Sequence, residues 1–175
     1  MENLKLIAPA VELKLEFLEM LEEFKNDGAG IINGIGSIDQ NDFDNSVILA
    51  QRHSLGIDLP KEWVPASTYW LINEQYKLLG TCNLRHHLNG YLEIIGGHVG
   101  YSIRPSQRRK GYATKMLSLV IEKAKAMNIH GLLIVCDDAN IASAKVIEKN
   151  GGFLINKLLS REDFRFKRRY WIDLI

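Results

Sequence analysis

The sequence contains few cysteines and prolines, has no long uninterrupted hydrophobic stretch and carries almost no net charge. Its 175 residues include 2 cysteines and 4 prolines, and the formal net charge is +1. Because Cys82 and Cys136 lie in apolar stretches without a CxxC or Cys/His pattern, we expect buried, reduced thiols and no metal site. A dedicated nucleic-acid-binding protein usually has a strongly basic balance, so the near-neutral charge argues against nucleic acid as a partner.

Signals for membrane insertion or export are also lacking. No stretch approaches the length of a transmembrane helix. The N-terminal residues are charged, and their apolar run is too short for a signal peptide. We therefore expect a cytoplasmic protein with no membrane partner. Hydrophobic residues make up 46% of the chain and charged residues 25%, which is typical of an ordinary globular protein, here a single domain over residues 1–175.

Hydrophobic patterning predicts an α/β (α+β) protein in which strands and helices alternate. Residues 11–24 have the amphipathic pattern of a helix, and residues 43–52 are predicted to form a second one. Two further helices are predicted, one that begins near Gly111 and one over residues 141–150. The predicted strands cover residues 4–8, 67–73, 77–85, 91–95, 99–103, 131–136 and 164–174.

Residues 99–117 are the most informative part of the chain. They predict a strand, a turn, a basic loop and a helix, with the pattern Arg108-x-x-Gly111-x-Ala113 where the helix begins. A helix start offers backbone N–H groups and the positive end of the helix dipole to an anion. Gly111 and Ala113 leave room for that anion, and positive charge comes from Arg108, Arg109 and Lys110. The predicted ligand is a pyrophosphate.

A second pattern follows the apolar strand predicted at residues 131–136. A turn leads into Asn140-x-x-Ser143-x-x-Val146-Ile147, and a glycine pair closes the predicted helix. By residue type alone, Asn140 is favoured as a helix N-cap rather than as a ligand-binding residue. The two roles need not exclude each other.

Together the two patterns resemble the signatures of the GNAT superfamily of N-acetyltransferases, over about residues 93–153. The resemblance implies the GNAT fold, a central mixed and mostly antiparallel β-sheet flanked by helices. It also implies direct transfer of an acetyl group from acetyl-CoA, as co-substrate, to a primary amine. The residues implied to bind acetyl-CoA are Tyr101, Ser102, Ile103, Arg108, Arg109, Lys110, Gly111, Tyr112, Ala113, Thr114, Asn140 and Ser143.

The catalytic positions depart from the family pattern. The family's tyrosine, which often protonates the departing thiolate, is matched by Ile147, and two positions often used by a general base are Gly97 and Val99. His98 lies between them and is a candidate base if the preceding glycines break the strand pleat; otherwise it is a hydrogen-bonded structural residue. Weaker candidates are Glu93, Tyr170, His86 and His87. A water chain without a dedicated base is also open.

The sequence does not specify the acceptor, which the resemblance leaves as the amine of a small molecule or a peptide. We expect contacts to it from residues 28–44, the C-terminal strand and three aromatic residues, Trp63, Tyr69 and Trp70. The acidic residues Asp39, Asp42 and Asp44 suit a cationic amine, and a solvated helix start explains them equally well.

Two other functional interpretations remain open. A catalytically weak or inactive acyl-CoA-binding module of the same fold is favoured by Ile147 and by the uncertain base. The basic and aromatic residues from Arg161 to Trp171 resemble a nucleic-acid-binding stretch, although their alternation favours an ordinary edge strand. A homodimer is also left open.

Overall fold

Two antiparallel sheets form the centre of the molecule in the computed structural model, which describes residues 3–28, 32–36 and 38–174. The first sheet consists, in spatial order, of β1 (Lys5–Ile7), β2 (Ala66–Ile72), β3 (Leu78–Arg85) and β4 (Val99–Ile103). The second consists of β5 (Gly131–Asp137), β7 (Phe166–Asp173) and β6 (Phe153–Leu159). The predicted fold class is confirmed, with the sheet divided between β4 and β5.

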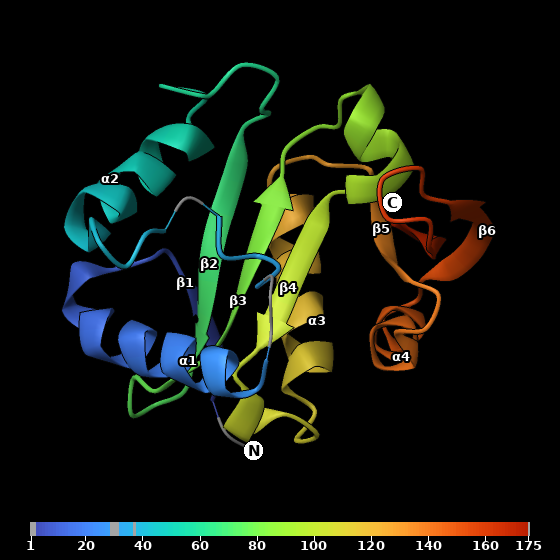
Figure 1. The fold of residues 1–175 in the computed structure, drawn as a ribbon. Coiled ribbons are helices and arrows are strands. Elements are labelled where there is room, and N and C mark those ends of the chain that lie inside the picture. The colour runs from blue at the N-terminus through green and yellow to red at the C-terminus, as the bar shows by residue number, and fades with distance from the viewer. Residues whose placement is uncertain (1–2, 29–31, 37, 175) are drawn as a thin grey trace.

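Helices cover both faces of the first sheet (Figure 1). The helices α1 (Lys14–Asn26) and α2 (Phe43–Ser54) pack on one face, where the rings of Phe17 and Trp70 stack with centroids 5.4 Å apart. The helices α3 (Tyr112–Ala126) and α4 (Ile141–Lys149) belong to the other hydrophobic cluster. Since successive strand residues point to opposite faces, Trp70 enters the first cluster and Leu71 the second.

Residues 91–95 do not extend the sheet, so the strand predicted there is wrong. They form most of a short π-helical turn, η2 (Leu92–Gly96). The side-chain oxygen of Asn89 accepts the N–H of Leu92 at 3.0 Å, and the N–H of Gly97 donates to the carbonyl of Leu92 at 2.6 Å. Asn89 therefore starts this turn, and Gly97, with a φ of +65°, ends it. The two adjacent isoleucines in this segment favour a strand in the sequence, although the segment is helical.

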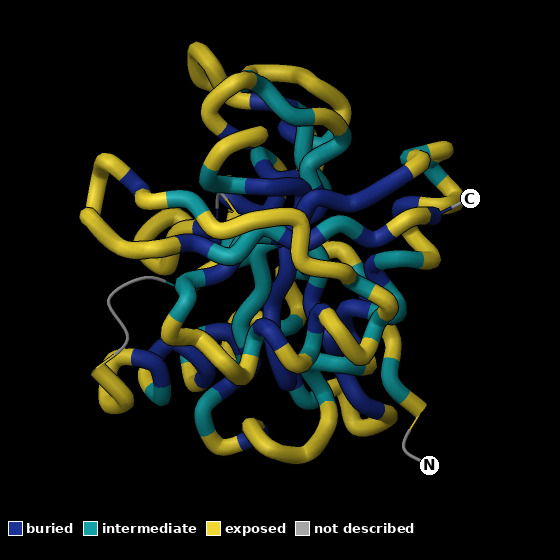
Figure 2. Tube along the Cα trace, turned by 90° about the vertical axis from the view of Figure 1, so that its right-hand side faces the viewer, coloured by how far each residue is buried: buried dark blue, intermediate teal, exposed yellow. Residues whose placement is uncertain are grey.

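The strand β6 was not predicted, because its sequence does not alternate between hydrophobic and polar residues. It is the edge strand of the second sheet, and both of its faces are exposed. Figure 2, seen from the side on which β6 lies in Figure 1, shows exposed segments across the front of the molecule. The strand predicted at residues 164–174 is β7, but it is the central strand of the second sheet, so the edge strand favoured from its sequence is wrong. Its alternation holds at Tyr170 and Ile172, which are buried, and fails at Phe166, which is 54% exposed.

A buried arginine ties α1 to the end of β4. The side chain of Arg104 is only 5% exposed, and its guanidinium contacts Glu16, Glu19 and Glu23 at 2.9, 3.0 and 2.6 Å. These three residues share one side of α1, because their spacing follows the helical repeat. Burial acts against the charge of Glu23, but hydrogen bonds from the N–H of Ser106 and from Arg104 lower its pKa. The segment that follows β4 is therefore held against α1.

We expect Arg104→Gln to reduce the free energy of unfolding by about 2 kcal/mol, because it removes the buried guanidinium that bonds to the partly exposed carboxylates of Glu16, Glu19 and Glu23. Urea unfolding measures this loss, and Arg161→Gln, in an exposed loop, is the matched control. The pKa of Glu23 lies below its ordinary value of 4.5 in the folded state. Its contribution is therefore present at neutral pH and lost in acid, so the difference between Arg104→Gln and wild type should narrow as the pH falls. Equal stability of both variants at pH 7 would contradict this role of Arg104.

Candidate functional site

The two sheets meet where His98 lies beside Leu133. The N–H of His98 donates to the carbonyl of Leu133 at 2.7 Å, and the N–H of Leu133 donates to Nδ1 of His98 at 2.9 Å. In the described part of the chain β4 and β5 share no continuous ladder, and they diverge from this point (Figure 1). We call the region between the diverging strands the fork. A Cβ atom on Gly97 would lie 2.6 Å from the carbonyl oxygen of Leu133, so glycine is needed where the strands meet.

The edge of β4 that faces the fork presents backbone groups of alternate residues. The N–H of Arg104 donates to the carbonyl of Leu79 on β3. Because hydrogen-bonded residues alternate along an antiparallel pair, Ser102 also directs its backbone groups to β3, where it lies opposite Thr81. Tyr101 and Ile103 direct theirs to the fork. Of the three residues expected to bind a ligand through the backbone, Ser102 is therefore placed in the ladder instead.

The helix start predicted to bind pyrophosphate is open. Gly111 is the N-cap residue of α3 with a φ of +84°, and no side chain caps the helix there. A Cβ atom built on Gly111 would meet nothing within 4 Å. The first backbone N–H groups of a helix have no partner within the helix itself, so an anion at Gly111 would find both donors and space.

The three basic side chains of the loop differ in their surroundings. Arg108 is turned toward α1, where its Nη1 lies 2.7 Å from a carboxylate oxygen of Asp27 and its guanidinium lies 5.8 Å from the ring centre of Phe24. Lys110 donates to the neutral side chain of Gln107 at 2.9 Å. Arg109 is exposed. Positive charge for an anion therefore comes mainly from Arg109 and Lys110, because Asp27 already neutralises Arg108.

The start of α4 borders the fork and is linked to β4. Asn140 accepts the N–H of Ser143 at 3.0 Å through its side-chain oxygen, so its prediction as an N-cap is confirmed. The hydroxyl of Ser143 lies 2.8 Å from the hydroxyl of Tyr101, within hydrogen-bond distance. Burial raises the pKa of Tyr101 to about 12, so this phenol is protonated at neutral pH. The hydroxyl of Tyr101 on β4 is thus a proton donor located at the start of α4.

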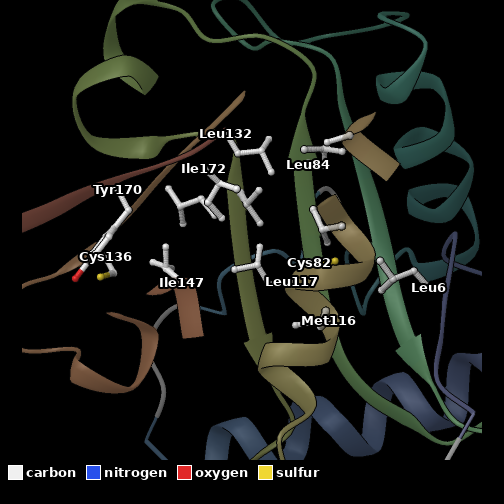
Figure 3. Close-up of a cluster of buried hydrophobic side chains, with 14 of the residues drawn as sticks. Leu6, Cys82, Leu84, Met116, Leu117, Leu132, Cys136, Ile147, Tyr170 and Ile172 are labelled. Atoms are coloured by element: carbon white, nitrogen blue, oxygen red, sulfur yellow. The ribbon is translucent and has the colours of Figure 1, made fainter. Parts of the chain in front are cut away.

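Ile147 lies in the hydrophobic cluster, beside Cys136 and Tyr170 (Figure 3). Its side chain is fully buried, and a Cβ atom built on Gly152 would come within 2.4 Å of its Cγ2. A tyrosine at this position would have to displace closely packed neighbours. Tyr170 is also buried, and its hydroxyl donates to Glu148 at 2.9 Å. Tyr170 thus serves as a core residue, which speaks against the catalytic role considered for it.

The surroundings of His98 are those of a hydrogen-bonded structural residue and not those of a catalytic base. It is 8% exposed, and burial is the main reason that its pKa falls to about 4. Its Nδ1 already accepts a backbone N–H, so protonation there would break one of the two bonds between the sheets. Glu93 lies on η2, where its backbone carbonyl accepts Arg169 at 2.6 Å. Among the weaker candidates, His86 contacts the hydroxyl of Ser67 at 2.9 Å.

A pocket of about 350 Å³ lies on the α2 side of the first sheet. Residues 32–36, α2, β2, β3 and residues 89–92 contribute to its wall. This wall touches β4, because a Cβ atom on Gly34 would lie 2.5 Å from the carbonyl oxygen of Gly100. The pocket therefore borders the same strand as the fork. Its charged and aromatic lining residues include Arg85, Glu62, Trp63 and Tyr91.

Some of the residues expected to contact an acceptor lie elsewhere. Trp63 lines the pocket, but Trp70 is fully buried and Tyr69 lies under Lys123. Residues 29–31 and 37 of the glycine-rich segment lie outside the described residues. The three acidic residues occupy a separate surface region: Asp39 and Asp42 line a shallow hollow beside α2, and Asp44 pairs with Lys14.

The described residues contain neither a metal-binding cluster nor a membrane-spanning helix. No three His, Cys, Asp or Glu side chains gather there in a way that could hold a metal ion. No helix in that part of the chain is long and apolar enough to cross a bilayer.

A family model described as the acetyltransferase (GNAT) domain matches residues 41–152. Among curated proteins, the chain is 31% identical over 65 residues to the uncharacterized N-acetyltransferase YnaD of Bacillus subtilis (strain 168). That match covers 35% of this chain and 38% of YnaD, well under half of either protein.

Solved structures share the fold over nearly the whole chain. One is the acetyltransferase from Salmonella typhimurium that modifies the N-terminal serine of ribosomal protein L7/L12, with a TM-score of 0.71, 17% identity and 99% and 96% of the two chains covered. Another is yncA of the same organism with its cofactor acetyl-CoA, with a TM-score of 0.64, 15% identity and 98% and 94% covered. The dodecameric spermidine N-acetyltransferase of Vibrio cholerae has a TM-score of 0.65, 16% identity and 98% and 94% covered.

The pKa of His98 predicts a pH-dependent stability. Because that pKa is about 4 in the folded protein and ordinarily 6.5, the contribution of neutral His98 is complete above pH 6.5 and declines as the pH falls toward 4. His98→Gln keeps an acceptor for the N–H of Leu133 but does not titrate. Its free energy of unfolding, measured in urea from pH 4 to 7.5, should lack this decline, whereas the exposed control His130→Gln should keep it. An unchanged decline in His98→Gln would assign the titration to another group.

Proposed function

Because the chain belongs to the GNAT family of acetyltransferases, we propose that it transfers the acetyl group of acetyl-CoA directly to an amine bound in the pocket beside β4. The observation that carries this proposal is the uncapped helix start at Gly111, which lies at the end of a strand whose open edge faces the fork. Such a helix start suits the pyrophosphate of acetyl-CoA, and the open edge suits the amide groups of its pantetheine arm.

The residues proposed to hold acetyl-CoA follow from this placement. The pyrophosphate would contact the backbone from Gly111 to Thr114, with charge from Arg109 and Lys110 beside it. Tyr101 would bond the pantetheine arm through its backbone groups, and Ile103 through its N–H, because the carbonyl of Ile103 already accepts Nε of Arg108 at 3.3 Å. Asn140 uses its oxygen as the cap of α4, so its amide N–H₂ is left for the same arm. The thioester would then lie near Tyr101, between the start of α4 and the pocket.

In the proposed reaction the amine nitrogen forms a bond to the acetyl carbon, and the bond between that carbon and sulfur breaks. The departing thiolate needs a proton, and we assign its donation to the hydroxyl of Tyr101, which lies 2.8 Å from the hydroxyl of Ser143. The resulting phenolate regains a proton, through water, from the nitrogen that is now bonded to the acetyl carbon. A phenol on β4 thereby takes the place of the family's phenol on α4, where this chain has Ile147. Proton donation of this kind typically contributes a factor of about one hundred or more.

The amine must lose its own proton before it attacks. His53 lines the pocket, but it is buried and its Nε2 lies 3.1 Å from the carbonyl oxygen of Asp58. Asn83 and Thr68, which are also buried there, are neutral and bond to each other at 3.2 Å. They can orient an amine but cannot deprotonate it. We therefore assign the proton transfer to water in the open pocket. Binding of acetyl-CoA without transfer to any amine would instead support a regulatory module.

Cofactor binding is tested by Gly111→Glu, which places a carboxylate where the pyrophosphate would lie. At about one-hundred-fold excess over its dissociation constant, acetyl-CoA should raise the melting temperature of the wild type by about 5 °C or more. Gly111→Glu should lose this shift. Gly151→Glu is the matched control, because Gly151 has the same left-handed backbone and open surroundings but lies at the end of α4. Equal shifts in all three proteins would exclude Gly111 from the binding site.

The role of Tyr101 is tested by Tyr101→Phe, which removes only the hydroxyl. We expect turnover, measured as thiol release, to fall about one-hundred-fold while the affinity for acetyl-CoA changes little. Tyr170→Phe tests the other phenol and should lower stability rather than turnover. Normal turnover in Tyr101→Phe would show that the thiolate leaves unassisted or is protonated by another group.

A further inference from the structure

Arg85 is a partly buried arginine without an ionic partner. Within the described part of the chain it forms no ion pair with Asp or Glu, whereas Arg104, Arg108 and Arg168 each pair with a carboxylate. Arg85 also lines the pocket beside β4. A cation that is removed from water without a counter-charge costs free energy, so its place in a pocket wall suggests that a ligand supplies the missing charge.

Neutral backbone groups hold Arg85 in position. Its Nη1 donates to the carbonyls of Gly96 and Gly97 at 3.3 and 2.8 Å, and its backbone N–H donates to the carbonyl of His98 at 2.8 Å. These bonds fix the guanidinium at the start of β4 but leave its charge uncompensated. Burial lowers the pKa of Arg85, as expected for a cation without a carboxylate beside it.

The rest of the pocket does not favour a polycation. The buried polar residues Asn83 and Thr68 are neutral, and the buried His53 lies against the carbonyl of Asp58. The exposed lining residues Trp63 and Tyr91 are aromatic. Glu62 is the acidic residue among the described lining residues, and it is exposed. A polyamine would need several buried carboxylates to replace its water. The volume of about 350 Å³ is at the small end of sites for small molecules.

We propose that the acceptor is a small amine that also carries an anionic group, a carboxylate or a phosphate, and that Arg85 binds this group. The proposal rests on the function proposed above and names its class of substrate. It reverses the expectation drawn from the three acidic residues near α2, because Asp39, Asp42 and Asp44 lie outside the pocket. A guanidinium matches both carboxylate and phosphate oxygens, so the two anions must be separated by experiment.

The first experiment compares acceptors that differ only in the anionic group. Thiol release from acetyl-CoA is measured with amino acids, the corresponding amino amides, aminoalkyl phosphates and spermidine. We expect the amino acids or the aminoalkyl phosphates to be preferred. Arg85→Gln should raise the KM for the preferred acceptor about 10- to 100-fold, as expected for loss of a charged hydrogen bond, and should abolish the preference over the neutral analogue. The KM for acetyl-CoA should not change, and Arg161→Gln should behave as wild type.

The second experiment does not depend on turnover. Trp63 lines the pocket, so its fluorescence can report occupancy, with Trp63→Phe to identify its signal. The probes are an N-acetylated amino acid, its amide, and an N-acetylated aminoalkyl phosphate. We expect saturable quenching by one of the anionic probes in the wild type, weaker binding of the amide, and loss of this difference in Arg85→Gln. The melting temperature of Arg85→Gln shows whether the variant is folded, and Arg85→Lys, which keeps a charge, should restore part of the difference.

The outcomes separate this proposal from the function on which it rests. Preference for spermidine or for neutral amines, or equal discrimination by wild type and Arg85→Gln, would overturn the anionic acceptor and leave the acetyltransferase intact. Absence of both acetyl-CoA binding and thiol release would overturn the acetyltransferase. Selective binding of the anionic probe in such a protein would still support Arg85 as an anion site. Equal binding of the anionic and neutral probes would overturn it.

Discussion

Two hydrogen bonds between His98 and Leu133 hold the two sheets together at one end and let them separate beyond it. A continuous ladder between β4 and β5 would satisfy the backbone groups of Tyr101 and the N–H of Ile103 within the protein and leave none of them for a ligand. A complete separation would expose the hydrophobic cluster beneath. The histidine is suited to this junction because its ring nitrogen accepts a backbone N–H as a carbonyl would, and burial keeps that ring neutral.

The strand β4 is common to both halves of the proposed site. One edge and face of it border the fork, where Tyr101 reaches Ser143 on α4. The other face borders the pocket, where Gly34 lies against Gly100. The cluster around Arg104 fixes α1 against the end of this strand, and Arg108 adds a second connection through Asp27. Donor and acceptor can therefore meet on one rigid element, as direct transfer requires.

Two buried or partly buried arginines close to this strand differ in whether carboxylates surround their charge. Arg104 is surrounded by three carboxylates and has a structural task. Arg85 is held by carbonyls alone and faces a pocket. The two phenols differ in a similar way. The hydroxyl of Tyr170 donates to Glu148 and its ring lies in the core, whereas the hydroxyl of Tyr101 lies beside Ser143 at the fork. In both pairs the surroundings, rather than the residue type, indicate which member is available for function.

The sequence by itself determined the four helices and most of the strands, the helix start at Gly111 and the cap at Asn140, because these depend on residues close together in the chain. It missed β6, whose exposed edge position leaves no alternating pattern, and it misassigned η2, which a capping asparagine and a glycine define. Only the tertiary structure decided which charges are compensated. Arg85, Arg104 and Arg108 look alike in the sequence, but the carboxylates that pair with Arg104 and Arg108 lie far away in the chain, and Arg85 has none among the residues that the structure describes. Whether a buried cation needs a ligand depends on those distant neighbours.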